Sequence, residues 1–213
     1  GVSFSEVDIK NKKPIIGTEK KVDCDTLLLS VGLIPENELS KKVGIELDPV
    51  TNGPVVNDRM ETSVEGIFAS GNVAHVHDLV DNVTKESEVA GRNAARYVLS
   101  KKKNTSIKIR TEAGHGVSYV VPQTIYPQEM EEELTLYLRV KDIYKNQRLM
   151  VSVGTEQNTK LICAIKRLIM APGEMQAINL RREQLLDYIK ETGIDTELIL
   201  TVYIEEKGER NDE

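Results

Sequence analysis

Two short runs of apolar residues stand out in the first half of the chain. One is Leu27–Val31, interrupted only by Ser30, and the other is Ile67–Ala69. Strands without polar alternation are typical of sheets that are covered on both faces, as in parallel α/β folds. Gly32 follows the first run and Gly71 follows the second, and glycine lets the backbone turn or approach a ligand closely. We therefore expect two buried strands of an α/β sheet here.

The residues between and after these runs predict a hairpin and a helix. Turn residues at Asn52-Gly53 separate two short apolar pieces, Ile45–Leu47 and Val55-Val56, which is typical of a hairpin. The segment Leu79–Ser100 has helical periodicity, because its apolar residues recur near one face. These residues are Val83, Val89, Ala90, Ala94 and Val98.

The pattern changes to period-two alternation in the second half of the chain. In Leu134–Val140, every second residue is apolar, and the runs Leu149–Val153 and Leu161–Ile165 follow at similar spacing. A helix is expected over Arg181–Lys190 and a last strand over Leu198–Ile204. This spacing predicts an all-β or mostly β sandwich over residues 106–213, of which the immunoglobulin-like fold is one kind.

Composition excludes several classes of protein. The 213 residues carry a net charge of -6, with 39% hydrophobic and 29% charged residues, as in ordinary globular proteins. A negative chain lacks the basic surplus that binds phosphate backbones, so no nucleic acid partner is expected. No apolar run approaches the roughly 20 residues of a membrane span. Cys24 and Cys163 stand far apart with no C-x-x-C spacing, which favours a reducing, cytoplasmic compartment.

Two segments carry a family resemblance over about the first 100 residues. They read "CDTLLLSVGLIPENEL" and "ETSVEGIFASGNV". Together they resemble the carboxyl-terminal part of the FAD-dependent pyridine nucleotide-disulfide oxidoreductases, which include thioredoxin reductase-like and NADH oxidase-like flavoproteins. In the second segment the family's FAD-binding motif is matched at Thr62, Ser63, Gly66, Ile67, Phe68, Ala69 and Gly71. The chain is then a carboxyl-terminal fragment with an appended β-domain.

The resemblance implies both a division of the chain and a set of cofactor contacts. Residues 1–24 would be the tail of the NAD(P)H-binding domain, and residues 25–105 the carboxyl-terminal half of a Rossmann-like FAD-binding domain. The implied FAD contacts are Gly32, Gly71, Asn72, Val73, Asn82 and Val83. The family has an acid that bonds a ribitol hydroxyl where this chain has Asn72, whose amide offers a neutral hydrogen bond instead. The helix after Asn72 would direct its N-terminal N–H groups at the flavin.

His75 and His77 are the candidate catalytic residues, although no role is assigned to either from the sequence. Alternation would place both rings on one side of an extended segment, with Asp78 and Asp81 nearby. No third histidine or cysteine lies close, so no metal site is predicted. Within the resemblance, one imidazole would serve as a proton relay to the flavin. The simpler alternative is that both are polar loop residues beside the pocket.

The features that the chain lacks limit the functional prediction. No G-x-G-x-x-G fingerprint follows a strand, and no redox-active cysteine pair is present. We expect the parent protein to transfer electrons between NAD(P)H and an unidentified acceptor through FAD, beside a second dehydrogenase subunit. The fragment alone is expected to be inactive and to bind no flavin. The alternative is a non-catalytic docking protein that retains the flavoprotein scaffold. Open sheet edges would favour a homo-oligomer.

Overall fold

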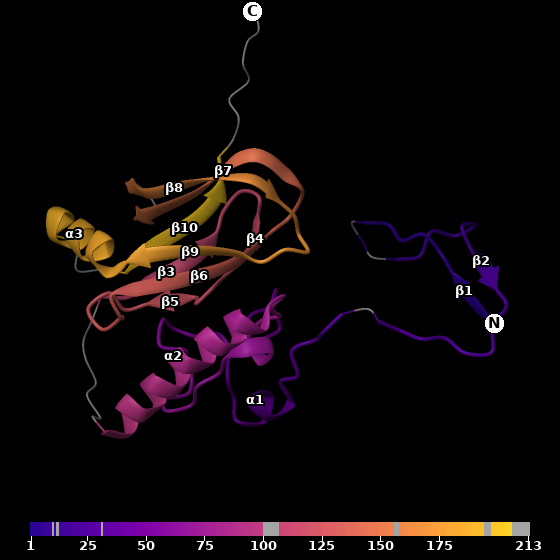
Figure 1. The fold of residues 1–213 in the computed structure, drawn as a ribbon, viewed down its shortest axis with the longest axis horizontal. Helices are drawn as coiled ribbons and strands as arrows, with labels where there is room; N and C mark the ends of the chain where they lie inside the picture. The colour runs from indigo at the N-terminus through magenta and orange to yellow at the C-terminus, as the bar shows by residue number, and fades with distance from the viewer. Residues whose placement is uncertain are drawn as a thin grey trace, which may run out of the picture. The chain divides into compact units, whose positions relative to one another are not determined.

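The computed structural model describes residues 1–9, 11, 13–30, 32–99, 107–155, 158–193 and 197–205. They form two units, Gly1–Leu33 and Ile34–Glu213 (Figure 1). The first unit contains one small antiparallel sheet, in which β1 (Val2–Phe4) pairs with β2 (Lys20–Val22). Both strands are short and largely exposed, so this unit has little core of its own.

The first apolar run does not form the buried strand that the sequence predicts. Residues 27–30 have no regular secondary structure. Leu27, Leu28 and Leu29 are 56%, 89% and 73% exposed. A strand of this kind is stable only between neighbouring strands and under covering helices, and no other strand pairs with it in the part of the chain that the structure describes. The prediction of a buried strand at Leu27–Val31 is therefore wrong for this structure, and Val31 itself lies outside the described residues.

The second apolar run forms a β-bridge instead of a regular strand. Phe68 pairs with Glu61 in an isolated antiparallel bridge, and Ala69 N–H donates to the carbonyl of Met60 at 3.0 Å. The expected hairpin before it is a tight loop closed by a bridge between Leu47 and Pro54. Ile67–Ala69 is half-buried, so the predicted buried strand is wrong here too, although its extended backbone is present.

Three helices of the second unit surround this region. They are α1 (Glu38–Lys42), the 3₁₀ turn η1 (Gly71–Val73) and α2 (Val80–Leu99). The prediction of a helix over Leu79–Ser100 is confirmed to within a residue at its start, and Ser100 lies outside the described residues. The buried residues of α2 are Glu86, Ala90 and Asn93, which share one face because they are spaced by three or four. Among the described residues, no helix is both long and apolar enough to cross a membrane.

The remaining residues form two sheets and one helix. The strands are β3 (Ile109–Ala113), β4 (Val117–Val121), β5 (Thr124–Ile125), β6 (Glu133–Val140), β7 (Tyr144–Gly154), β8 (Thr159–Met170), β9 (Gln176–Arg181) and β10 (Leu198–Ile204), with α3 (Arg182–Thr192) between the last two. One sheet has the order β5-β3-β10-β7-β8, and the other has the order β4-β6-β9. The pairing of β10 with β3 is parallel, and the other ladders of these sheets are antiparallel. The mostly β character of this part is confirmed, while its immunoglobulin-like form stays a prediction.

A continuous hydrophobic core joins the two sheets. It contains alternate residues of β6, such as Leu136 and Leu138, together with Leu149 of β7 and Leu200 of β10, all fully buried. A second cluster contains Val56, Met60, Ala74, Ala90 and Val121, so α2 and its preceding loops pack against the end of β4. The predicted boundary between residues 105 and 106 lies outside the described residues, and the predicted domain limits stay a prediction.

Truncating a core leucine should destabilise the chain far more than truncating an exposed one. Leu200 is 0% exposed, whereas Leu168 on β8 is 76% exposed. We expect Leu200→Ala to lower the free energy of unfolding by about 2–5 kcal/mol, because a cavity remains in the core. Leu168→Ala should change it by about 0.5 kcal/mol or less. Urea unfolding followed by circular dichroism measures both, and equal losses in the two variants would contradict this core.

Candidate functional site

A glycine turn connects the second apolar run to helix α2. Gly71 has a φ of +70° and begins the 3₁₀ turn η1. A Cβ at this position would lie 3.0 Å from Val83 Cγ1, so a side chain would meet both a strained backbone and a close neighbour. The backbone N–H of Gly71 donates to the carboxylate of Glu86. The turn therefore requires glycine for reasons internal to the fold.

The Asn72 side chain has a defined orientation in this turn. Its Oδ1 accepts a hydrogen bond from the backbone N–H of His77 at 3.1 Å, although the residue as a whole is exposed. No hydrogen bond from the amide NH2 to a described residue is found, and Oδ1 keeps a second lone pair. Both groups of this side chain therefore retain capacity for further hydrogen bonds.

The structure brings together five of the six predicted cofactor contacts. Val73 follows Asn72 in η1, and its carbonyl accepts from Asn37 Nδ2 at 2.9 Å. Asn82 and Val83 lie in the first turn of α2. Val83 Cγ1 lies 3.0 Å from the position that a Cβ on Gly71 would take. Gly32 belongs to the other unit, where its φ of +107° suits glycine. The roles of these six residues toward FAD stay predictions.

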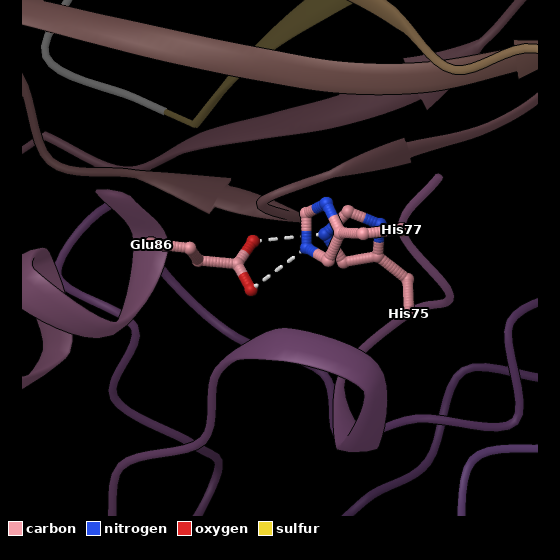
Figure 2. Close-up of side chains that lie close together, drawn as sticks. All are labelled: His75, His77 and Glu86. Carbon is pink, nitrogen blue, oxygen red and sulfur yellow. Dashed lines mark hydrogen bonds and ion pairs between the residues drawn. The ribbon is translucent and has the colours of Figure 1, made fainter. Parts of the chain in front are cut away.

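His75 and His77 meet Glu86 in a buried polar cluster. Figure 2 shows both imidazoles facing the Glu86 carboxylate, which projects from α2. His75 Nε2 lies 2.8 Å from Oε1, and His77 Nε2 lies 3.2 Å from Oε2. The exposed fractions of His75, His77 and Glu86 are 0%, 6% and 4%, and the two ring centroids are 4.2 Å apart. The expectation that both histidines share one side is confirmed, and the alternative that both are polar loop residues beside the pocket stays a prediction.

Glu86 is the residue of this cluster that the sequence analysis missed. Burial alone would raise its pKa, but hydrogen bonds from His75, His77 and the Gly71 N–H outweigh burial and lower the pKa to about 2. The carboxylate is therefore ionised at neutral pH. A signal was present in the sequence, because Glu86 falls on the same helix face as the apolar Val83 and Ala90. A charged residue on an apolar face usually has a buried partner.

Aromatic residues of the β-rich part close the cluster from the other side. The Tyr137 ring of β6 lies 5.7 Å from His75 and 5.3 Å from His77, measured between centroids. Burial raises the pKa of Tyr137, and the negative charge of Glu86 raises it further. Arg139 of the same strand forms an ion pair with Asp78, just beyond His77. The site is thus formed jointly by α2, the loop before it and strand β6.

A small cavity of about 90 Å³ lies beside the cluster, lined by Glu86, Tyr137 and Asp58 among others. Asp58 is 6% exposed, and its Oδ1 accepts from the backbone N–H of Tyr126 at 2.9 Å. Its Oδ2 has no hydrogen-bond partner among the described residues. Burial raises the pKa of Asp58 to about 7, although the Tyr126 N–H and Arg59 oppose the shift.

Comparison with known proteins identifies relatives of the first half of the chain. Residues 1–94 match the family model described as pyridine nucleotide-disulphide oxidoreductase. A dihydrolipoyl dehydrogenase of Manduca sexta is 30% identical over 135 residues, which cover 62% of this chain and 25% of that protein. A ferredoxin--NADP reductase of Picrophilus torridus is 31% identical over 76 residues, covering 36% of this chain and 22% of that protein.

A third relative is the rubredoxin-NAD(+) reductase of Pseudomonas putida, which is 35% identical over 65 residues, or 30% of this chain and 16% of that protein. The chain thus spans a quarter or less of the length of these relatives. No solved structure matches the chain. The resemblance drawn from the two sequence segments is confirmed by these matches.

The raised pKa of Asp58 predicts a specific dependence of stability on pH. The unfolded chain releases this proton near the ordinary value of 3.8, whereas the folded chain holds it up to about 7. Stability should therefore fall as pH rises from about 4 to about 7, by up to roughly 4 kcal/mol from this one group. Asp58→Asn should remove that part of the fall.

Urea unfolding at several pH values measures the difference between the chain and the variant. Asp187→Asn, which alters an exposed carboxylate of α3, is the matched control and should retain the slope of the unmodified chain. A slope that is unchanged by Asp58→Asn would show that this carboxyl is not held protonated in the fold.

Proposed function

Because residues 1–94 match the family model described as pyridine nucleotide-disulphide oxidoreductase, we propose that this chain supplies the carboxyl-terminal half of an FAD site. The enzyme would transfer electrons between NAD(P)H and an acceptor by way of FAD. The observation that carries the proposal is the turn from Gly71 to Val73, which leads through Asn72 to the start of the long helix α2. The activity of the whole protein is part of this proposal, since the chain spans only a fraction of its relatives.

The residues at this turn fit a flavin in three respects. Gly71, which is buried and has no side chain, allows the tight turn at the end of the second apolar run, and Asn72 retains an amide donor for a ribitol hydroxyl. Helix α2 is 20 residues long, and Asp81 at its start is exposed. The N-terminal end of a helix carries a partial positive charge, which suits the negative charge of a reduced flavin, and the Asn82 N–H already donates to the Leu79 carbonyl. Bound FAD would supply the chemistry of accepting and passing on a hydride.

The exposed leucines of the first unit support the idea of an incomplete sheet. Leu27, Leu28 and Leu29 form a run that suits a central strand, yet they are exposed here. We propose that they pair with the remainder of an FAD-binding sheet in the complete enzyme, and that Gly32 then turns toward the cofactor. The hydrophobic effect would favour this pairing, because each leucine that becomes buried contributes roughly 1.5–3 kcal/mol.

The partners of the enzyme follow from the same proposal. One relative is named the ferredoxin--NAD(+) reductase subunit of a benzene 1,2-dioxygenase system, and it is 35% identical over 74 residues. A reductase that passes electrons to a separate protein needs a docking surface, which the β-rich part of this chain would offer. The acceptor stays unidentified, and the proposed partner is a second dehydrogenase subunit in the cytoplasm. Self-association through open sheet edges is part of this proposal.

One observation favours a second function, that of a non-catalytic docking protein. Gly71 N–H and Asn72 Oδ1 are both bonded within the chain, to Glu86 and to His77 N–H, so the turn is stable without any ligand. The two functions differ in what precedes the chain in its gene. Two G-x-G-x-x-G fingerprints upstream support the enzyme, and the lack of both supports the docking protein.

The isolated chain should purify without stoichiometric flavin. Neither dinucleotide fingerprint is part of its sequence, and the phosphates of FAD would have no backbone cradle. The visible absorbance spectrum of the purified chain, before and after incubation with FAD and desalting, measures this directly. A yellow protein with one flavin per chain would contradict the half-site.

Substitutions at Asn72 in the complete protein should distinguish its proposed hydrogen bond to the FAD ribitol from its hydrogen bond to the His77 N–H. Asn72→Ala removes the donor to the ribitol and should weaken FAD binding about fivefold, the equivalent of one neutral hydrogen bond. Asn72→Asp keeps the acceptor for His77 N–H and provides a charged acceptor for the hydroxyl, so it should bind FAD at least as tightly as the unmodified protein.

Fluorescence titration of the apoprotein with FAD measures the dissociation constants. Asn158→Ala, which removes an exposed amide between β7 and β8, is the control and should leave FAD binding unchanged. Equal affinities in Asn72→Ala and the unmodified protein would exclude the proposed contact.

A further inference from the structure

The cluster of His75, His77 and Glu86 is more elaborate than a flavin half-site requires. All three side chains are at least nine-tenths buried. Burying an ionised carboxylate beside two imidazoles costs free energy, which hydrogen bonds within the cluster must offset. The Nδ1 atoms of both histidines are buried and have no hydrogen-bond partner among the described residues. Each such buried polar atom costs about 1–3 kcal/mol.

We propose that His75, His77 and Glu86 form a binding site for a divalent first-row transition metal ion. The two Nε2 atoms and a carboxylate oxygen are the ligand atoms, and they all lie within 4.8 Å of one another. None of its three ligands is among the predicted cofactor contacts, but Glu86 and His77 are hydrogen-bonded to Gly71 and Asn72, which are. It also answers why two histidines at alternate positions converge on one acid.

The ligand atoms of the cluster lie slightly closer together than they would around a bound metal ion. Ligands bound at about 2.1 Å with tetrahedral angles lie about 3.4 Å from one another. The observed separations between imidazole nitrogen and carboxylate oxygen are 2.8 Å for His75 and 3.2 Å for His77. Small movements of the side chains therefore suffice to admit an ion in place of the Nε2 protons.

The types of ligand limit which ion binds. Two imidazoles and one carboxylate suit Zn²⁺ or Fe²⁺, whereas Mg²⁺ and Ca²⁺ prefer oxygen ligands. Three protein ligands leave a coordination position for water, and the adjoining cavity of about 90 Å³ is lined by Glu86 itself.

The fold already holds the ligands in place before any ion binds. Glu86 is fixed on the inner face of α2, and its carboxylate also accepts from the Gly71 N–H. The His77 backbone is held by Asn72, and the Tyr137 ring packs beside both imidazoles. A bound ion would therefore clamp η1 and the loop after it onto α2, which gives it a structural role beneath the turn.

Direct metal titration of the chain tests the site. The protein is stripped with a chelator and titrated with Co²⁺, a coloured substitute for Zn²⁺, and separately with Zn²⁺ or with Fe²⁺ under anaerobic conditions. We expect one equivalent of Co²⁺ to produce visible absorption bands, and Zn²⁺ or Fe²⁺ to raise the melting temperature by mass action. The ion that gives the larger shift at equal concentration identifies the preferred metal.

Variants assign the binding to these residues. His77→Asn and Glu86→Gln should each weaken Co²⁺ binding by more than about 100-fold, since the loss of even an outer-shell partner costs about 10–100-fold. The third histidine, His115, is exposed, and His115→Asn should bind as the unmodified chain does. Circular dichroism verifies that each variant is folded, and His77→Asn decides the result if Glu86→Gln does not fold.

Three results would overturn the proposal. The first is a melting temperature that none of the three ions changes, with no Co²⁺ bands. The second is binding that survives in the folded His77→Asn variant. The third is binding that His115→Asn abolishes equally, which would indicate a non-specific surface site.

Discussion

The carboxylate of Glu86 is the interaction on which the architecture of the second unit depends. It accepts hydrogen bonds from Gly71 N–H, His75 and His77, and it is carried by the inner face of α2. One buried charge thus ties a positive-φ turn, an irregular loop and a long helix together. Removing any of its partners would leave the carboxylate buried with too few hydrogen bonds. The loss of one partner of a buried ionic group therefore costs more stability than replacing the whole group by apolar residues.

The β-rich part completes this arrangement, so the two parts of the second unit depend on each other. The Tyr137 ring covers both imidazoles, and Arg139 on the same strand pairs with Asp78. Without this cover, water would reach the Glu86 carboxylate and weaken its bonds to the histidines. If the β-rich part had no contact with the loop before α2, the cluster would be exposed to solvent. The contacts of Tyr137 and Arg139 instead make strand β6 part of the site.

Local pattern predicted the elements whose apolar residues repeat at a regular interval, and it failed where a continuous apolar run or a single acid depends on distant residues. Helix α2 and strand β10 were predictable because their apolar residues repeat along a single segment. Leu27–Leu29 read as a buried strand, yet such a strand is specified by neighbours that the described residues do not include. Glu86 escaped notice because it lies nine residues after His77, and only the path through η1 and α2 brings them together.

The turn at Gly71 shows how a scaffold and a binding site can share the same residues. The Gly71 N–H donates to Glu86, and the side-chain Oδ1 of Asn72 accepts from the His77 N–H. These two bonds within the chain fix the backbone of the turn. Among the described residues, the Asn72 NH2 takes no part in these internal bonds, whereas the Asn82 N–H in the first turn of α2 donates to the Leu79 carbonyl at 3.1 Å. Preorganisation of this kind lowers the entropy lost on binding. A ligand that needs hydrogen-bond donors then finds them already aligned, and an ion beneath the turn would make that alignment stiffer.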